Sequence, residues 1–206
     1  MSKKNIPQHI NNRFQQVYWT FYLCNSSLTE LHHLTNQKFE SDEIEMINSH
    51  PFSFYRVTLQ YTFILEFNKL FEKGRNNKEG VSSLIKLNEL LRNELGNDFE
   101  ETYEENLNII EEIKSSEYFQ NIITLRNKKF AHSEKHSENL PFKVKGLTTE
   151  KIFESFEYLK KLSEIIKKCT LCYDFEYDLS IPTSETRTLN FIKLQSKYKQ
   201  HFYKSK

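Results

Sequence analysis

The chain has 206 residues, a formal net charge of +1, and 28% charged and 37% hydrophobic residues. These values are typical of one globular domain with or without a tail, and they exclude a globally basic nucleic-acid binder, so any basic surface must come from local clustering. Only four glycines and four prolines are present, which argues against an all-β sandwich or a Rossmann fold and favours long helices with few breaks.

Targeting signals and membrane spans are not expected from this sequence. The N-terminal segment lacks the apolar stretch of a signal peptide, and no apolar run approaches the roughly 18 residues of a membrane-spanning helix. Three cysteines without the spacing of a disulfide framework indicate a reducing compartment. We therefore expect a cytoplasmic protein without a membrane partner.

Two long helices are predicted in the first third of the chain. Apolar residues recur at helical spacing over residues 8–36, and the polar, acidic segment 38–50 then predicts a loop with a short helix. Pro51 is well placed to open a second helix, which is apolar on most faces and is therefore expected to be the central one. Gly74 is the expected C-terminal cap of that helix.

The third predicted helix follows a pair of serines. Ser82 and Ser83 can cap it, and it extends to about Leu95 with a leucine stripe on one side. The turn "GNDF" follows, in which Asn97 or Asp98 can cap the next helix.

Three further helical segments complete the expected bundle. Residues 99–115 form an acidic helix, residues 116–134 another helical stretch, and Thr148 or Thr149 caps an amphipathic helix. The inward positions of this last helix are Ile152, Phe156, Leu159, Leu162 and Ile166. The predicted fold is thus all-α, an antiparallel up-down bundle of four to five long helices with short additional helices.

Domain organisation follows from where this pattern ends. We expect a bundle domain over residues 1–175 and a C-terminal extension over 176–206, first irregular and then a basic helix. The extension either docks on the bundle or binds a partner.

The segment "TLRNKKFAHSEKH" (124–136) carries the chemistry. Arg126 offers a planar fork of donors that matches phosphate oxygens, and His132 can exchange a proton near neutral pH. Together they can support metal-free cleavage of RNA, in which the histidine removes the 2′-hydroxyl proton and the arginine stabilises the transition state. Asn127 can hold the phosphate or orient the histidine. Ala131, the chain's single alanine, allows another helix or a substrate backbone to approach closely.

The spacing of this pair is awkward on a straight helix. Positions six apart, such as Arg126 and His132, lie ~120° apart around a helix and ~9 Å apart along it. The long arginine side chain, a π-bulge or helix end at this point, or pairing of two chains across a shared cleft would each bring the groups together.

A family resemblance rests on these residues. The run Arg126-Asn127-x-x-x-Ala131-His132 resembles the Rx4-6H motif of the HEPN superfamily, whose members are small all-α domains, often dimeric, and in many cases metal-independent endoribonucleases. Over roughly residues 10–170, "PFSFYRVTLQYTFILEFNKLF", "SSLIKLNELL" and "LRNKKFAH" are similar in order and spacing to AbiU-type abortive-infection HEPN proteins.

This resemblance implies a function and its partners. Arg126, Asn127 and His132 would be the catalytic residues of an endoribonuclease that leaves 2′,3′-cyclic phosphate ends and needs no cofactor. The expected setting is phage defence or a toxin–antitoxin system, with a homodimer sharing a composite active site and an antitoxin or nucleotidyltransferase as partner. The family also includes members without catalysis, so a helical module that binds RNA, nucleotide or a protein stays open.

Four further residues are candidates for substrate binding. Lys128 and Lys129 make the segment locally cationic, as RNA phosphates require, although a solvated helix face explains them nearly as well. His136 is either a substrate contact or a loop residue, and Arg56 either contacts substrate or pairs with a carboxylate. His132 and His136 have the i, i+4 spacing of zinc ligands, but no third ligand follows, so no metal site is expected.

Overall fold

The structure, a computed structural model, describes residues 6–36, 38–72, 82–127, 147–171, 173, 191–195 and 197. The elements along these ranges are α1 (Gln8–Asn36), α2 (Ser41–Ile47), α3 (His50–Lys69), α4 (Leu84–Leu95), the 3-10 turn η1 (Gly96–Asp98), α5 (Glu100–Ser115), α6 (Glu117–Leu125) and α7 (Thr149–Thr170). Since all of these elements are helical, the predicted all-α class is confirmed.

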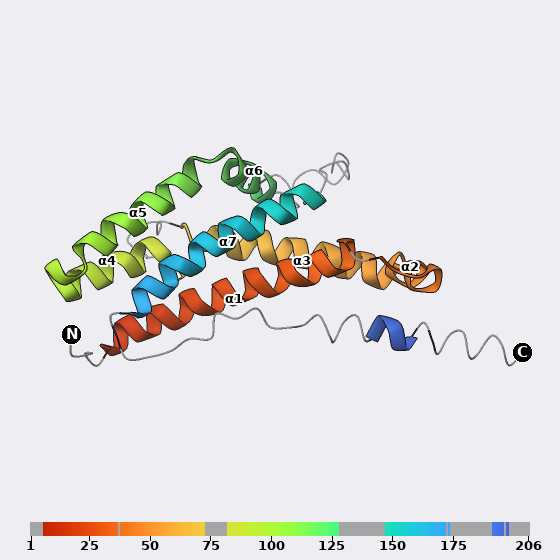
Figure 1. Cartoon of the computed structure of the whole chain (residues 1–206), viewed down its shortest axis with the longest axis horizontal. Helices are drawn as coiled ribbons and strands as arrows, with labels where there is room; N and C mark the ends of the chain where they lie inside the picture. Colours follow the sequence, from red (N-terminus) through yellow and green to blue (C-terminus); the bar gives the residue numbers. More distant parts are fainter. Residues whose placement is uncertain are drawn as a thin grey trace, which may run out of the picture.

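The long helices alternate in direction. α1 runs one way, α3 and α4 return, α5 runs back beside α4, and α7 returns along α1 (Figure 1). This is the predicted antiparallel up-down arrangement. None of the helices in the described ranges is long and apolar enough to cross a membrane.

The central helix of the bundle is α1, which corrects the prediction that the second long helix is central. α1 packs against α3, α4 and α7. Its buried face carries large apolar side chains such as Phe14 and Leu28. The buried hydroxyl of Ser27 is satisfied within the helix, because it donates to the carbonyl of Leu23 at 2.6 Å. α3 is more apolar, yet it leaves Phe54 (68% exposed), Val57 (50%) and Tyr61 (39%) on the surface.

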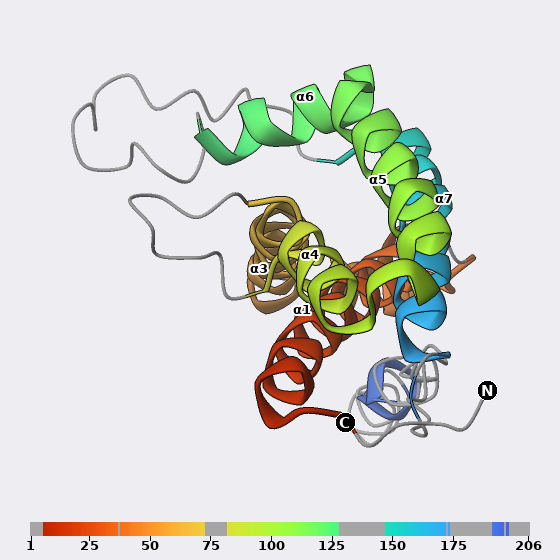
Figure 2. The same cartoon turned by 90° about the vertical axis from the view of Figure 1, so that its left-hand side faces the viewer.

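α3 ends earlier than the sequence predicts, at Lys69 instead of next to Gly74. The N–H of Leu84 donates to the carbonyl of Leu70 at 2.9 Å, so this carbonyl is bonded to the start of α4 and not to a continuing turn of α3. α4 therefore starts where α3 stops, and the two helices lie nearly in line (Figures 1 and 2). The position expected for the glycine cap lies outside the described residues.

Side-chain capping explains two of the helix starts. Ser83 accepts from the N–H of Lys86 and starts α4, and Thr148 accepts from the N–H of Lys151 and starts α7, as predicted. At the start of α5 the predicted cap is wrong, because Phe99 and not Asn97 or Asp98 occupies the N-cap position.

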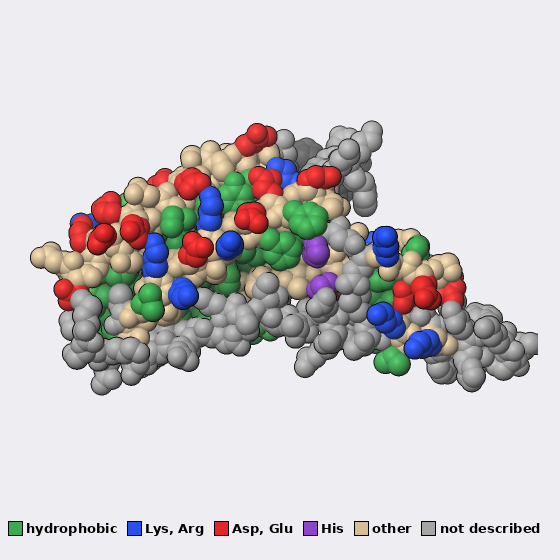
Figure 3. All heavy atoms as spheres, viewed as in Figure 1, with side chains coloured by type: hydrophobic (Ala, Val, Ile, Leu, Met, Phe, Trp, Pro, Cys, Tyr) green, Lys and Arg blue, Asp and Glu red, His purple; other side chains and the backbone are tan. Residues whose placement is uncertain are grey.

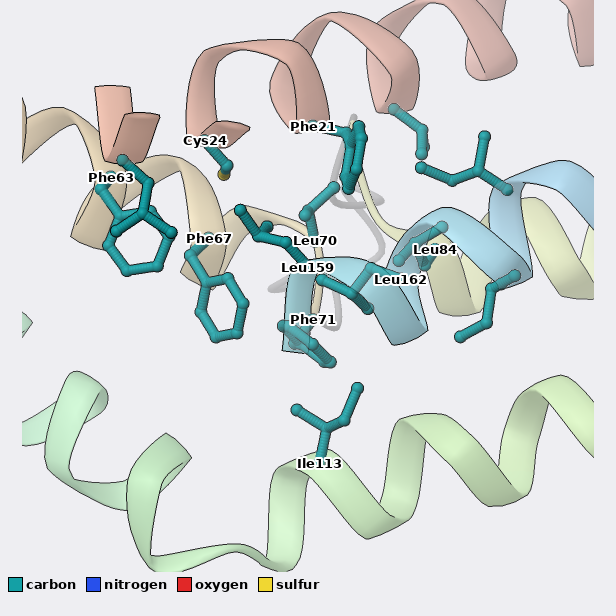
Figure 4. Packing of buried hydrophobic residues seen from close by; sticks show 14 of the residues in the cluster. Phe21, Cys24, Phe63, Phe67, Leu70, Phe71, Leu84, Ile113, Leu159 and Leu162 are labelled. Carbon is teal, nitrogen blue, oxygen red and sulfur yellow. The ribbon is translucent and has the colours of Figure 1, made fainter. Parts of the chain in front are cut away.

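The core lies where these helices meet. Figure 4 shows Phe21 and Cys24 of α1 facing Phe67 and Leu70 at the end of α3, with Leu159 of α7 beside them. Burial of these large apolar side chains supplies the main driving force for folding. In the C-terminal extension the side chain of Ile192 is also buried.

Candidate functional site

The site begins at the corner between α5 and α6. Ser116 forms this corner, since its hydroxyl donates to the carbonyl of Ile113 at 2.6 Å and accepts from the N–H of Phe119 at 3.2 Å. One side chain thus ends α5 and caps α6. Figure 2 shows the consequence: α6 turns away from the direction of α5 and crosses the end of the bundle towards α3.

Tyr118 fixes one side of α6 to α7. Its buried hydroxyl forms a hydrogen bond of 2.5 Å with the hydroxyl of Ser155, and its ring stacks on Tyr158 with the centroids 4.5 Å apart. Burial raises the pKa of Tyr118, so the phenol stays protonated and the hydrogen bond persists over the physiological pH range.

Phe119 fixes the other side of α6 to the end of α3. Its ring centroid lies 4.7 Å from that of Phe71 and 6.2 Å from that of Phe67, and all three rings are buried. Figure 4 shows Phe67 of α3, and Phe71 of the turn after it, in this part of the core. α6 is only nine residues long, so its last residue lies close to these two contacts. Packing on both sides therefore fixes where α6 ends.

Arg126 follows directly on α6 and meets a carboxylate of α3's end. Its Nη2 donates to Oε1 of Glu72 at 2.5 Å, and the two side chains are 37% and 38% exposed. Arg126 and Asn127 adopt a π-helical turn in place of a further α-helical one. A wide turn or a helix end was one of the three ways to reconcile the motif's spacing with a shared site, and it lies at the expected place.

The remaining motif residues are placed only in part. Asn127 is exposed beside Arg126. His132, Lys128, Lys129 and His136 lie outside the described residues, so their roles stay predictions.

Arg56 lies away from this site within one chain. It sits in the first half of α3, where its Nη2 donates to the hydroxyl of Ser53 at 3.4 Å. From Arg56 to Lys69, at the end of the same helix, the distance along the axis is roughly 20 Å. Arg56 and Arg126 of one chain are therefore not positioned to bind the same phosphate.

Glu72 is the site residue that sequence reasoning did not find. It is separated from Arg126 by 54 positions, and nothing in the spacing of either segment predicts their contact. A carboxylate at the end of an apolar helix is ordinarily a solvated charge. Only the crossing of α6 over the end of α3 gives it a partner.

The opposite surface of the bundle carries paired charges. Figure 3 shows acidic side chains gathered along α5 and lysines of α7 between them. Lys161 contacts Glu112 at 2.6 Å, and Lys168 contacts Glu105 at 2.7 Å. Such a mixed surface gives no continuous positive potential, so this face is a poor candidate for RNA binding.

Comparison with known proteins assigns the chain to a family. The family model HEPN_AbiU2, described as AbiU2, matches residues 14–186. Since the match covers most of the sequence, the chain belongs to the AbiU2 family of HEPN proteins and the predicted family resemblance is confirmed, whereas the assignment of the motif to Arg126, Asn127 and His132 stays a prediction. No curated protein and no solved structure matches the chain significantly. The match extends past residue 175, where we place the start of the tail, and that boundary remains a prediction.

Proposed function

We propose that this protein is a metal-independent endoribonuclease of the HEPN type that acts in phage defence or a toxin–antitoxin system. The supporting observation is the place of Arg126: half-exposed, at the end of a short helix that is fixed to both α3 and α7, and directly ahead of the segment that carries His132. An arginine in such a setting can present fixed donors to a phosphate, which is the contribution the reaction needs from it.

In the proposed reaction His132 removes the proton of a 2′-hydroxyl as general base. The 2′-oxygen attacks the adjacent phosphorus, and the bond from phosphorus to the 5′-oxygen breaks. Arg126 stabilises the charge that develops on the phosphoryl oxygens, and Asn127 holds the substrate phosphate or orients the imidazole. The 5′-oxygen takes up a proton from the protonated imidazole or from water as it leaves, and the product carries a 2′,3′-cyclic phosphate. The reaction needs the 2′-hydroxyl, so DNA would not be cleaved.

The test is cleavage of RNA in the presence of EDTA by the wild type and by the His132→Ala variant. We expect cleavage by the wild type alone. Arg92→Ala serves as the matched control, because Arg92 also pairs with a glutamate but does so at the far end of α5, 2.6 Å from Glu100. Equal inactivity of wild type and His132→Ala would overturn the proposal.

One observation favours a second candidate, a non-catalytic HEPN module that binds RNA, nucleotide or a protein partner. Arg126 already has a carboxylate partner in Glu72, and such a pair can simply tie α6 to α3. The module predicts RNA or nucleotide binding without cleavage, and the same experiment separates the two candidates.

We also propose that the protein acts as a homodimer. The exposed stripe of Phe54, Val57 and Tyr61 along α3 supplies an apolar surface that pairing would remove from water. Size-exclusion chromatography with light scattering tests this proposal. We expect a dimer for the wild type and a monomer for Phe54→Glu, whereas Phe153→Glu, which changes an exposed aromatic residue of α7, should leave the dimer intact. A wild-type monomer would contradict it.

A further inference from the structure

The contact between Arg126 and Glu72 differs in kind from the contact between Arg92 and Glu100. Glu72 engages Arg126 through one oxygen and one nitrogen, Oε1 and Nη2. Glu100 engages Arg92 through both oxygens, at 2.8 Å to Nε and 2.6 Å to Nη2, and the guanidinium also lies over the ring of Tyr103 at 4.4 Å. The guanidinium of Arg92 is therefore bound through two of its nitrogens, whereas that of Arg126 is bound to Glu72 through one nitrogen only.

A guanidinium held at one corner keeps donors for a ligand. It has five N–H groups in a rigid plane, and the one contact at Nη2 leaves those on Nε and Nη1 without a hydrogen bond to the described part of the chain. A phosphate accepts two parallel hydrogen bonds from such an edge. The carboxylate thus restrains the plane of the side chain while its other edge stays available.

Glu72 itself is held in place by its neighbours in the sequence. Phe71 is buried against Phe119, the N–H of Glu72 donates to the carbonyl of Lys69 at 3.3 Å, and the carbonyl of Leu70 accepts from the start of α4. The carboxylate therefore projects from a packed junction. A partner fixed in this way can orient the guanidinium, which a side chain on a free helix end could not do.

We propose that Glu72 is a positioning residue for Arg126, holding its guanidinium so that the remaining N–H donors face the scissile phosphate. This inference rests on the proposed nuclease function and deepens it. Glu72 does not touch the reacting atoms. A half-exposed ion pair adds little to stability, so its main effect is on geometry.

The kinetic signature of this role is distinctive. In the Glu72→Ala variant the guanidinium loses its restraint, and kcat should fall on the order of tenfold. The same change removes a negative charge next to the RNA phosphates, so KM should stay unchanged or fall. Glu72→Gln keeps an acceptor for the Arg126 N–H and should recover most of kcat. Glu100→Ala breaks the matched Arg92 pair and should leave both constants at the wild-type values.

A second measurement reports on positioning without relying on cleavage. The Nε–H signal of Arg126, followed by NMR in the full chain bound to an RNA oligonucleotide with a 2′-deoxy scissile position, should be sharp in the wild type and in Glu72→Gln. It should broaden or move to the free-arginine position in Glu72→Ala.

The two readouts separate the two proposals. If the wild type shows an ordered Nε–H signal that Glu72→Ala abolishes, but cleaves no RNA, the nuclease function fails and Glu72 is left only as a restraint on the Arg126 side chain. If the signal is the same in wild type and Glu72→Ala, or if Glu72→Ala cleaves with the wild-type kcat, positioning is overturned even though the nuclease function survives.

Discussion

Oε1 of Glu72 lies 2.5 Å from Nη2 of Arg126, so a carboxylate at the end of α3 meets a guanidinium at the end of α6 across 54 residues of sequence. Two buried contacts of α6 create this meeting. Phe119 packs against the end of α3, and Tyr118 is hydrogen-bonded to α7. The core of the bundle thereby sets the position of the residue that we assign to transition-state stabilisation.

The shape of the Arg126 side chain should matter more than its charge. Arg126→Lys keeps a positive charge but loses the planar fork, and we expect kcat to fall on the order of 10²-fold. The free energy of unfolding should change by less than about 1 kcal/mol, because the ion pair is half exposed to solvent. Steady-state cleavage and chemical denaturation measure the two quantities. Wild-type kcat in the lysine variant would mean that charge alone suffices.

Phe119 should influence cleavage through the position of α6. Phe119→Leu removes ring contacts to Phe71 and Phe67 worth about 1 kcal/mol, and the resulting shift of Arg126 should lower cleavage on the order of tenfold at temperatures well below unfolding.

The control is Phe63→Leu. Phe63 is fully buried in α3, and its ring lies 5.4 Å from that of Phe67 without fixing α6. A similar loss of stability with near-normal cleavage is expected. Equal loss of cleavage in both variants would mean that general destabilisation, and not the placement of α6, explains the effect.

The sequence contains most of the helices but not the site's geometry. Helical periodicity and local caps such as Ser83 and Thr148 act over a few residues, so they can be predicted from the chain alone. The end of α3 could not be predicted in this way, because it depends on a hydrogen bond between Leu70 and Leu84. Nor could the identity of the central helix be predicted, since α1 lies against α3, α4 and α7 through tertiary packing, which the apolarity of one segment does not encode.

The candidate site divides in the same way. Arg126 and Asn127 stand out in the sequence because of their place in a short motif next to a histidine. Glu72 does not, because its role arises only from how two distant helix ends cross. Contacts of this kind depend on tertiary packing, which periodicity and capping do not encode.

Asn106 should stabilise the bundle through a buried amide pair. It is fully buried in α5, and its Nδ2 donates at 3.0 Å to Oδ1 of Asn88, while Nδ2 of Asn88 donates to the carbonyl of Tyr103. Asn106→Ala leaves an acceptor of Asn88 unsatisfied and should lower the free energy of unfolding by about 1–3 kcal/mol. The exposed Asn108 of the same helix is the control, and Asn108→Ala should change the free energy of unfolding by less than about 0.5 kcal/mol. Equal effects would refute a role for the buried pair.

Stability should fall at mildly acidic pH because of His32. Partial burial, and to a lesser extent the neighbouring His33, lowers the pKa of His32 below its ordinary value of 6.5. Between the folded and unfolded pKa values the unfolded chain binds more protons, so the free energy of unfolding decreases as pH falls through and below about 6.5. Above that pH range His32 is neutral in both the folded and the unfolded state, so its protonation no longer lowers the free energy of unfolding.

Thermal unfolding between about pH 7.5 and 5.5 measures this dependence. His32→Gln should flatten it, whereas His9→Gln, which changes an exposed histidine near the start of α1, should not. An unchanged slope in His32→Gln would assign the pH dependence to other groups.

The most direct test of metal-free cleavage by Arg126 and His132 is the chemistry of the RNA ends. Wild-type protein is incubated in EDTA with a synthetic RNA, and the mass of the 5′-terminal fragment, whose new 3′ end carries the scissile phosphate, is determined. The account predicts a 2′,3′-cyclic phosphate, absent when His132 or Arg126 is replaced by alanine. A 3′-hydroxyl end, or cleavage that appears only when a divalent cation is added, would contradict it.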